Sequence, residues 1–337
     1  DQGWWPDGLY TASTDEALRY DIEMTLAMGF NMARKHVKVE PERWYTWADR
    51  LGLMVWQDMP SGFVTGEREG VPKTDHANFR RELQAVMEAR DHHPCIVAWI
   101  PYNEGWGQPD AEGTNETLKW TKQRDPSRFV GAASGWTDHG WGDWKDKHQY
   151  PGPGMFPTME DRVSVLGEYG GLGLPVEGHL WWDKRNWGYR TYGSVDELQS
   201  NYRDLTRRLR RLVPRGLAAA VYTQTTDCEG EVNGLMTYDR EPKLDAAWLK
   251  ALHAPLYGSF APIQLTPLSP TSEEKGQPWR YTFDPPEPGW EKPGFNDEAW
   301  REGPGGFGTE GTPGAHVRTA WDGDRIWLRR RFPADPP

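Results

Sequence analysis

Residues 95–108, CIVAWIPYNEGWGQ, join an apolar run to a cluster of aromatic and polar residues. The run at residues 96–100 has the length and composition of a strand that is buried on both faces. It ends at Glu104, between Tyr102 and Trp106. In a barrel of alternating strands and helices, the ends of such strands form the rim where the chemistry takes place. The segment therefore predicts a catalytic proton donor at Glu104, with a glutamate that only closes a turn as the alternative reading.

Helices and strands alternate on both sides of this segment. The apolar periodicity and the capping residues predict helices at residues 14–28, 41–51, 78–90, 112–124, 194–212 and 243–252. They predict strands at residues 31–39, 53–56, 96–100, 129–133, 147–150, 163–166 and 216–224. Repeated strand–helix units imply parallel strands with right-handed crossovers. The predicted fold class is α/β, a (β/α)8 TIM barrel whose remaining strand precedes or includes Asp1.

The composition of the sequence changes after Ala254. A proline-rich stretch without helical periodicity follows, and we place a domain boundary near Tyr257. The prediction is a catalytic barrel at 1–257, entered near the end of its first strand, and a linker with a partial β-sandwich at 258–337. The chain is expected to be a piece of a longer protein.

The bulk composition argues against several classes of partner. With 39 Lys and Arg against 50 Asp and Glu, the net charge of -11 disfavours nucleic acids and anionic membranes. No apolar run has the length of a membrane helix, and two cysteines make no disulfide framework. The 20 tryptophans, many of them in loops or beyond strand ends, suit the stacking of sugar rings, although many must simply fill the core. We favour a secreted or periplasmic address over a cytoplasmic one.

A second carboxylate follows another strand. The apolar residues 163–166 run directly into Glu168, Tyr169 and Gly170. Two carboxylates at two strand mouths form the pair that glycoside hydrolysis needs. Carboxyl groups about 5 to 5.5 Å apart would retain the anomeric configuration, whereas about 6.5 to 9.5 Å would leave room for a water and invert it. The sequence leaves both the retaining and the inverting mechanism open.

At this point the chain resembles glycoside hydrolase family 2, whose members include β-galactosidases, β-glucuronidases and β-mannosidases. The resemblance covers about residues 1–258 and rests on GFNMARKH at 29–36, on Asn103–Glu104 and on Glu168–Tyr169–Gly170. It implies a retaining mechanism with Glu104 as acid/base and Glu168 as nucleophile. It also implies that Asn103 binds the sugar 2-hydroxyl and that Arg34 lies close to the nucleophile. The tail from Trp279 resembles the start of a sugar-binding jelly roll, and the sandwich domains that usually precede the family's barrel are absent from this chain.

The sequence departs from the family pattern in three places, one of which is Tyr222, where relatives often have Trp and the subsite wall changes. Arg34, Lys35 and His36 form a motif one residue shorter than usual, so a second-shell or core role for His36 is as plausible as substrate binding. β-Glucuronidases use an Asn-x-Lys pair after the last strand to hold the uronate, but here residues 231–233 are Glu, Val and Asn. These residues therefore offer no cation to bind the carboxylate of a uronate, and a glucuronide is disfavoured.

The other candidates have competing structural readings. Asp58 either contacts substrate hydroxyls or caps the next segment, and Tyr150 either hydrogen-bonds the nucleophile or packs. Trp106 is assigned to the substrate site, and Trp136 makes either a stacking wall or a cover for the rim. Asp227 and Glu229 are expected to bind loop amides. Adjacent residues seldom share one ion, so His92–His93 predicts no metal site, and neither a catalytic metal nor a cofactor is expected.

The sequence thus predicts an exo-acting retaining β-glycosidase for terminal neutral sugars. Family prevalence favours a β-galactoside; galactofuranosides, arabinosides and mannosides are alternatives, and a glucuronide is a weaker one. A non-catalytic carbohydrate-binding protein on the same scaffold and a structural subunit of a larger assembly are the competing classes. The expected partners are a carbohydrate and either the missing N-terminal domains or further copies of the chain.

Overall fold

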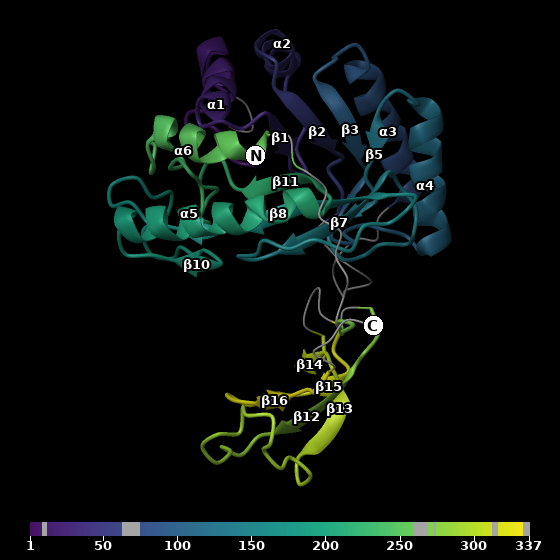
Figure 1. The fold of residues 1–337 in the computed structure, drawn as a ribbon. Helices are drawn as coiled ribbons and strands as arrows, with labels where there is room; N and C mark the ends of the chain where they lie inside the picture. Colours follow the sequence, from purple (N-terminus) through teal and green to yellow (C-terminus); the bar gives the residue numbers. More distant parts are fainter. Residues whose placement is uncertain are drawn as a thin grey trace. The chain divides into compact units, whose positions relative to one another are not determined.

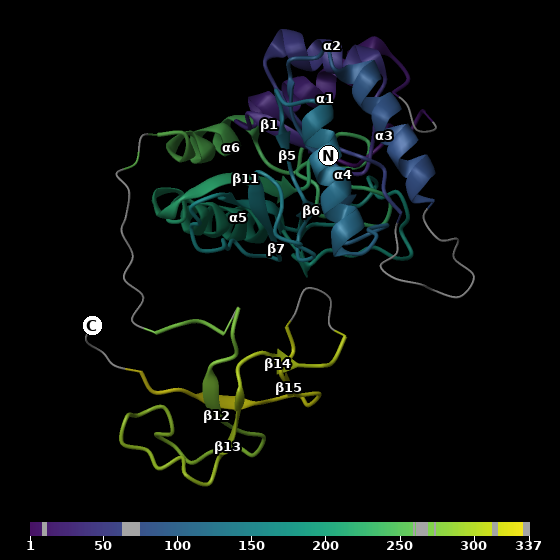
Figure 2. The same ribbon diagram turned by 90° about the vertical axis from the view of Figure 1, so that its right-hand side faces the viewer.

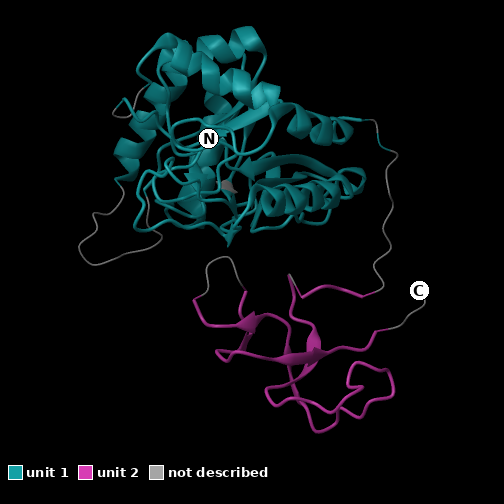
Figure 3. Cartoon of the chain, turned by 90° about the vertical axis from the view of Figure 1, so that its left-hand side faces the viewer, with its two compact units in different colours: residues 1–263 teal, residues 264–337 magenta. Residues whose placement is uncertain are grey.

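The computed structural model describes residues 1–8, 12–62, 75–258, 260, 269–272, 274–311 and 316–332. The chain forms two compact units, Asp1–Ile263 and Gln264–Pro337, shown in two colours in Figure 3. The segment 261–268, which the sequence assigns to a linker, lies outside the described residues. In the part of the chain that is described, no helix combines the length and the apolarity needed to cross a membrane.

Unit 1 alternates helices and strands as the sequence predicts. Its helices are α1 (Asp15–Ala27), α2 (Glu42–Leu51), α3 (His76–Arg90), α4 (Ala111–Arg124), α5 (Val195–Arg210) and α6 (Ala246–His253), with 3-10 turns η1 (Val213–Arg215) and η2 (Ala254–Leu256). Its strands are β1 (Met32–Lys35), β2 (Met54–Asp58), β3 (Ile96–Ile100), β4 (Tyr102–Asn103), β5 (Phe129–Val130), β6 (Ala133–Ser134), β7 (Trp144–Gln149), β8 (Val163–Gly170), β9 (Leu172–Gly173), β10 (Arg190–Thr191) and β11 (Leu217–Thr223). The α/β class is confirmed.

The helix ends follow from local chemistry. The Thr14 hydroxyl accepts a hydrogen bond from the Ala17 amide and caps α1, and Asp110 caps α4 in the same way through Gly113. Gly52 closes α2 with φ of 80°, a left-handed conformation that glycine adopts without a Cβ clash. These caps fix the residues at which the helices begin or end.

The strands of unit 1 are parallel and form two main sheets. One has the order β1-β2-β3-β5 and the other β11-β8-β7, and a parallel bridge between Gly131 and Trp144 links them. Asp1 lies beside β1, since the His36 amide donates to its carbonyl. Among the described residues no ladder joins β1 to β11, so a closed eight-stranded barrel remains a prediction.

Apolar side chains cover both faces of these sheets. Helices lie on the outer side of the strands (Figures 1 and 2), where one core packs around Trp44, Leu83 and Ile96 and a second around Leu205 and Leu249. On the inner side, the Trp56 and Trp144 rings stack with centroids 4.5 Å apart. The near-continuous apolar run in β3 is explained by this double burial.

Unit 2 is all-β in its described part. Its strands are β12 (Pro278–Thr282), β13 (Arg301–Pro304), β14 (Phe307–Gly308), β15 (Thr319–Ala320) and β16 (Trp327–Arg329). The antiparallel sheet has the order β13-β12-β16, and β14 pairs with β15. This is less than a sandwich, so the jelly roll is not confirmed.

Candidate active site

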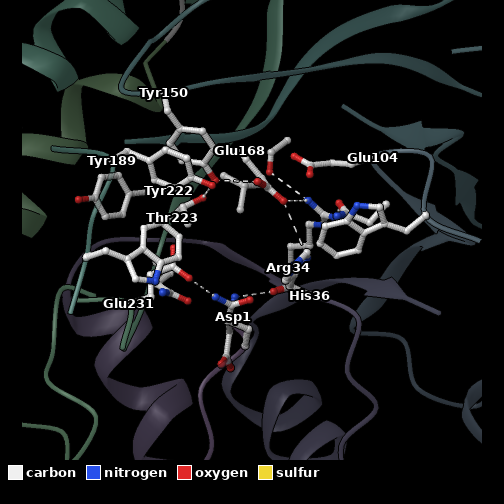
Figure 4. Close-up of a pocket in the computed structure, with 17 residues that line it drawn as sticks. Asp1, Arg34, His36, Glu104, Tyr150, Glu168, Tyr189, Tyr222, Thr223 and Glu231 are labelled. Atoms are coloured by element: carbon white, nitrogen blue, oxygen red, sulfur yellow. Dashed lines mark hydrogen bonds and ion pairs between the residues drawn. The ribbon is translucent and has the colours of Figure 1, made fainter. Parts of the chain in front are cut away.

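A cavity of about 300 Å³ opens where the parallel strands of unit 1 end (Figure 4). The register brings these ends together, because His148 on β7 lies opposite Glu168 on β8, and Asn103 on β4 lies opposite Ser134 on β6. Seventeen residues line the cavity: Asp1, Gln2, Arg34, His36, Asn103, Glu104, Trp106, Tyr150, Gly167, Glu168, Trp187, Tyr189, Val221, Tyr222, Thr223, Gln224 and Glu231. This is the strand edge at which barrel enzymes place their chemistry.

Glu104 and Glu168 meet across this cavity. A carboxylate oxygen of each and Nδ1 of His148 all lie within 4.8 Å of one another. His148 Nδ1 is 2.8 Å from Glu104 Oε1 and 3.3 Å from Glu168 Oε2. Both glutamates keep some exposure, 15% and 12% of their side chains. The two carboxylates thus face one sugar-sized space, and neither is buried under the core.

The surroundings of Glu168 keep it ionised. Arg34 donates to Oε1 at 3.0 Å and the Tyr150 hydroxyl donates to Oε2 at 2.6 Å. Burial alone would raise the pKa of Glu168, but the charges of His148, Arg34 and His36 and the Tyr150 hydrogen bond outweigh it and lower the pKa to about 2. A carboxylate held in this form is suited to act as a nucleophile.

Arg34 is held in place by Asp58. Its Nε and one terminal nitrogen donate to the two oxygens of Asp58 at 3.0 and 2.8 Å, and the same nitrogen reaches Asn103 Oδ1 at 2.7 Å. Burial opposes the charge on Asp58, yet Arg34 and His36 outweigh it and lower the pKa of the carboxyl. Asp58 therefore fixes the guanidinium that supports Glu168.

Replacing Asp58 with Asn should destabilise the protein strongly. The side chains of Arg34 and Asp58 are only 2% and 1% exposed, so the substitution leaves a buried guanidinium without its main counter-charge. The expected loss in the free energy of unfolding is about 3 to 5 kcal/mol, measured by urea unfolding of the full chain. Glu23→Gln, which breaks the exposed Arg19–Glu23 pair, is the control and should cost about 0.5 kcal/mol or less. Equal losses in the two variants would contradict this role for Asp58.

A polar chain behind the glutamates determines which nitrogen of His148 carries hydrogen. The Ser134 hydroxyl donates to Asp146 Oδ2 at 2.7 Å, so it can only accept from His148 Nε2, also at 2.7 Å. Nδ1 is then left to face Glu104. Burial would lower the pKa of His148, but Glu168, the hydrogen bond to Glu104 and Asp146 outweigh it and raise the pKa. The raised pKa of His148 favours a proton on the contact between its Nδ1 and Glu104 Oε1, 2.8 Å apart.

Gly135 permits this close arrangement. Its φ is 104°, and a Cβ at this position would lie 3.2 Å from both Glu104 Cγ and His148 Nδ1. An L side chain would be strained here and would crowd this contact.

The structure brings most of the predicted residues together. Those that line the cavity are Arg34, His36, Asn103, Glu104, Trp106, Tyr150 and Glu168. His36 Nδ1 lies 3.5 Å from Asp58 Oδ2 and 3.8 Å from Glu168 Oε1, so it is a neighbour of both carboxylates. The resemblance had left the role of His36 open, because the motif from Arg34 to His36 is one residue shorter than is usual in the family.

Two predicted residues do not line the cavity. Asp58 lies outside the lining of the cavity, and both of its oxygens accept hydrogen bonds from Arg34. Trp136 is 37% exposed and meets the His148 ring edge-on with centroids 5.8 Å apart, so it covers this histidine from outside. Asp227 accepts from the Gly234 amide at 2.8 Å, which confirms the expected loop contact, and it also pairs with Lys243 at 2.7 Å.

His92 and His93 contact one carboxylate oxygen. Their Nε2 atoms lie 2.7 and 2.9 Å from Glu42 Oε1, and His93 Nδ1 lies 2.6 Å from Asp49. Two further groups in the described residues bring potential ligand atoms together: Asp49 with His93 and Cys95, and Glu104 and Glu168 with His148. The two adjacent histidines therefore reach the same carboxylate oxygen, and the expectation that they hold no metal ion stays a prediction.

Sequence reasoning missed His148, Asp146, Tyr189 and the position of Glu231. The signal for the first two was present, since Trp144, Asp146 and His148 alternate along β7 and are all buried, while Lys145 and Lys147 between them are less buried. Tyr189 stacks on Tyr150 with ring centroids 3.6 Å apart and comes from a loop without regular periodicity. Its place on the wall follows from tertiary structure alone.

Known proteins resemble part of this chain in sequence. Residues 11–140 match the family described as glycosyl hydrolases family 2, TIM barrel domain. The chain is 33% identical over 123 residues to a β-galactosidase of Vibrio cholerae serotype O1, covering 34% of this chain and 11% of that protein. It is 30% identical over 97 residues to β-mannosidase B of Thermothelomyces thermophilus, covering 27% of this chain and 11% of that protein. The matches span only about a tenth of these relatives.

Solved structures share the fold over a longer stretch. A family 2 β-galacturonidase from Eisenbergiella tayi, bound to galacturonate, superposes with a TM-score of 0.59 at 16% identity, covering 74% of this chain and 49% of that one. A β-glucuronidase of Bacteroides uniformis gives a TM-score of 0.53 at 20% identity, covering 71% and 33%. At these identities the likeness concerns the fold. Membership of glycosyl hydrolases family 2 is supported by the match at residues 11–140 and by the curated relatives.

Proposed function

We propose that the chain is the catalytic part of a retaining exo-β-glycosidase that releases terminal neutral sugars. The observation that carries this proposal is the approach of Glu104 and Glu168, with an oxygen of each within 4.8 Å across the cavity. Retaining enzymes hold their carboxyl groups about 5 to 5.5 Å apart, and an inverting pair would need a water between them. The small volume of about 300 Å³ fits one terminal sugar ring, which supports exo action.

In this proposal Glu168 attacks the anomeric carbon and forms a glycosyl ester. Glu104 protonates the departing oxygen, then removes a proton from the water that cleaves the ester. Asn103 positions the sugar. Arg34 donates to Asn103 Oδ1, so the buried Nδ2 of Asn103 is left without a partner among the described residues. This donor is placed to bind the hydroxyl next to the anomeric carbon.

The wider architecture is proposed on the same grounds. We propose that the two parallel sheets and the segment at Asp1 are parts of a closed (β/α)8 barrel, and that the three-stranded antiparallel sheet of unit 2 is the start of a sugar-binding jelly roll. A non-catalytic sugar-binding protein is less well supported, because nothing about binding alone requires two carboxylates to face each other.

A panel of 4-nitrophenyl glycosides tests the proposed function on the full-length protein. β-Galactosides come first, since matched relatives include β-galactosidases. Proton NMR of the sugar first released should show the β-anomer, as retention requires. Release of the α-anomer would contradict the double displacement, and no turnover of any glycoside would contradict the function.

Replacing His148 with Gln should move the alkaline limb of the pH profile of kcat/KM to lower pH. When one proton is shared by two sites, removing one site lowers the pKa at which the proton is lost. The groups facing His148 are Glu104, Glu168, Asp146 and Arg34, and all of them remain in the variant. We expect a shift of about one pH unit or more.

The matched control for this experiment is His93→Gln. It also removes a buried, carboxylate-paired histidine, but on a group outside the cavity. Its pH profile should coincide with that of the wild type. An unchanged alkaline limb in the His148 variant would show that His148 does not determine it.

A further inference from the structure

Glu231 extends the cavity wall beyond the two catalytic glutamates. It follows β11 in a loop that pairs with the loop at Trp187, and it lines the same cavity as Glu104 and Glu168. Resting on the proposed function, we propose that Glu231 and Gln224 select the sugar, accepting hydrogen bonds from hydroxyl groups of a neutral glycon and excluding uronic acids.

A chain of side-chain amides orients this part of the wall. Asn233 Nδ2 donates to Glu231 Oε1 at 2.8 Å, and Gln2 Nε2 donates to Oε2 at 3.0 Å. With its Nδ2 used in this way, Asn233 offers Oδ1 to Gln224 Nε2, 2.8 Å away. Each amide therefore has one orientation, and the carboxylate sets it.

The last amide in this chain leaves an acceptor unused. Gln224 Oε1 is buried and has no hydrogen-bond partner among the described residues. Both Glu231 oxygens already take amide hydrogens, yet a carboxylate has about four lone-pair sites and can accept more. The wall thus presents acceptors. A ligand must bring donors here, which hydroxyl groups do and a carboxylate does not.

The charges around the cavity also favour a neutral sugar over a uronate. Its lining contains three glutamates, whereas the described basic side chains that line it are Arg34 and His36. The Arg34 nitrogens bind Asp58, Glu168 and Asn103, so the guanidinium is already engaged. His36 lies against Asp58 and Glu168. A uronate would therefore meet Glu231 without a free cation to compensate for the repulsion.

The nearby lysines do not change this balance. Lys35 binds Asp1 and Glu40, and Lys38 binds Glu40 and the Gly3 carbonyl, and neither lines the cavity. Burial and the charge of Glu168 raise the pKa of Glu231, while the amides of Asn233 and Gln2 oppose this increase. The two amide donors favour the ionised carboxylate.

Matched substrate pairs test this selection. 4-Nitrophenyl β-galactoside and β-galacturonide differ only in a hydroxymethyl group and a carboxylate at the same carbon, as do the glucoside and the glucuronide. The wild type should favour the neutral member of each pair by about 100-fold in kcat/KM. Glu231→Gln should lose about 10- to 100-fold on the neutral member, and Glu231→Lys should lower the neutral-to-uronide ratio by about 100-fold.

Glu229→Lys is the matched control. It makes the same charge change in the same loop, but Glu229 is exposed and does not line the cavity, so the ratio should stay within about twofold of the wild type. The proposal is overturned if the wild type prefers the uronide, or if Glu231→Lys leaves the ratio where Glu229→Lys does.

A binding experiment separates this proposal from the catalytic one. Galactose and galacturonate are titrated against the full chain, with the fluorescence of the cavity tryptophans Trp106 and Trp187 as readout. Tighter binding of galactose, with the preference reduced in Glu231→Lys, supports the role of Glu231 even if no glycoside is turned over. Tighter binding of galacturonate by the wild type refutes it whether or not catalysis is found.

Discussion

Glu168→Gln should abolish turnover, lowering kcat/KM by roughly 10⁴-fold or more on every glycoside that the protein cleaves. Glutamine has the same shape and keeps an oxygen for the Tyr150 hydroxyl, but its amide is too weak a nucleophile to form the glycosyl ester. Initial rates with a 4-nitrophenyl glycoside measure the loss. Circular dichroism checks that the fold survives the removal of a buried anion.

A smaller substitution tests the same role by chemical rescue. In Glu168→Gly, azide can enter the space of the missing carboxylate and attack the anomeric carbon from the nucleophile's side. Since a single displacement inverts this centre, the product should be the α-glycosyl azide. Glu241→Gln, at an exposed glutamate outside the cavity, should leave kcat/KM within about twofold. Near-normal activity in Glu168→Gln would overturn the assignment.

The low pKa of Glu168 adds a pH signature. Because the folded protein lowers this pKa from 4.5 to about 2, the nucleophile stays ionised throughout the mildly acidic range. A loss of activity between pH 5 and pH 4 should therefore come from another group or from unfolding. The interactions that lower the pKa also stabilise the fold above about pH 4.5, and this contribution fades as the pH falls towards 2.

The local sequence was enough to predict most of the α/β framework. Caps such as Thr14 and Gly52 mark where helices begin and end, and the apolar run in β3 requires burial on both faces. Two glutamates that each follow an apolar strand could also be identified, because parallel strands bring their carboxyl ends to one edge. These features depend on short stretches of chain and on one topological rule.

The finer parts of the site depend on side chains that meet only after folding. Asp58 was expected either to contact substrate hydroxyls or to cap the next segment, but the Arg34 guanidinium from β1 takes both of its oxygens. His148 looked like an ordinary residue of a polar strand, and only the register between β7 and β8 places it against Glu168. Glu231 reaches the cavity through loop contacts with Trp187, which no periodicity predicts.

Glu104→Ala should separate the two steps of the reaction. For a substrate with a poor leaving group, such as a methyl glycoside, loss of the acid should lower kcat/KM by about 10²- to 10⁴-fold. For a 2,4-dinitrophenyl glycoside, whose leaving group needs no proton, kcat/KM should remain within about tenfold of the wild type. Its kcat should still fall, because no base activates the water that cleaves the glycosyl ester.

Azide identifies the side from which Glu104 acts. It needs no general base, so it should restore the kcat of Glu104→Ala with the dinitrophenyl substrate and give the β-glycosyl azide, the opposite anomer from that of Glu168→Gly. The alkaline limb assigned to His148 should also change in the kcat/KM profile, since His148 Nδ1 has lost its carboxylate partner at 2.8 Å. An α-azide from the Glu104 variant, or equal losses on the two leaving groups, would show that the roles of the two glutamates are reversed or that Glu104 is not the acid.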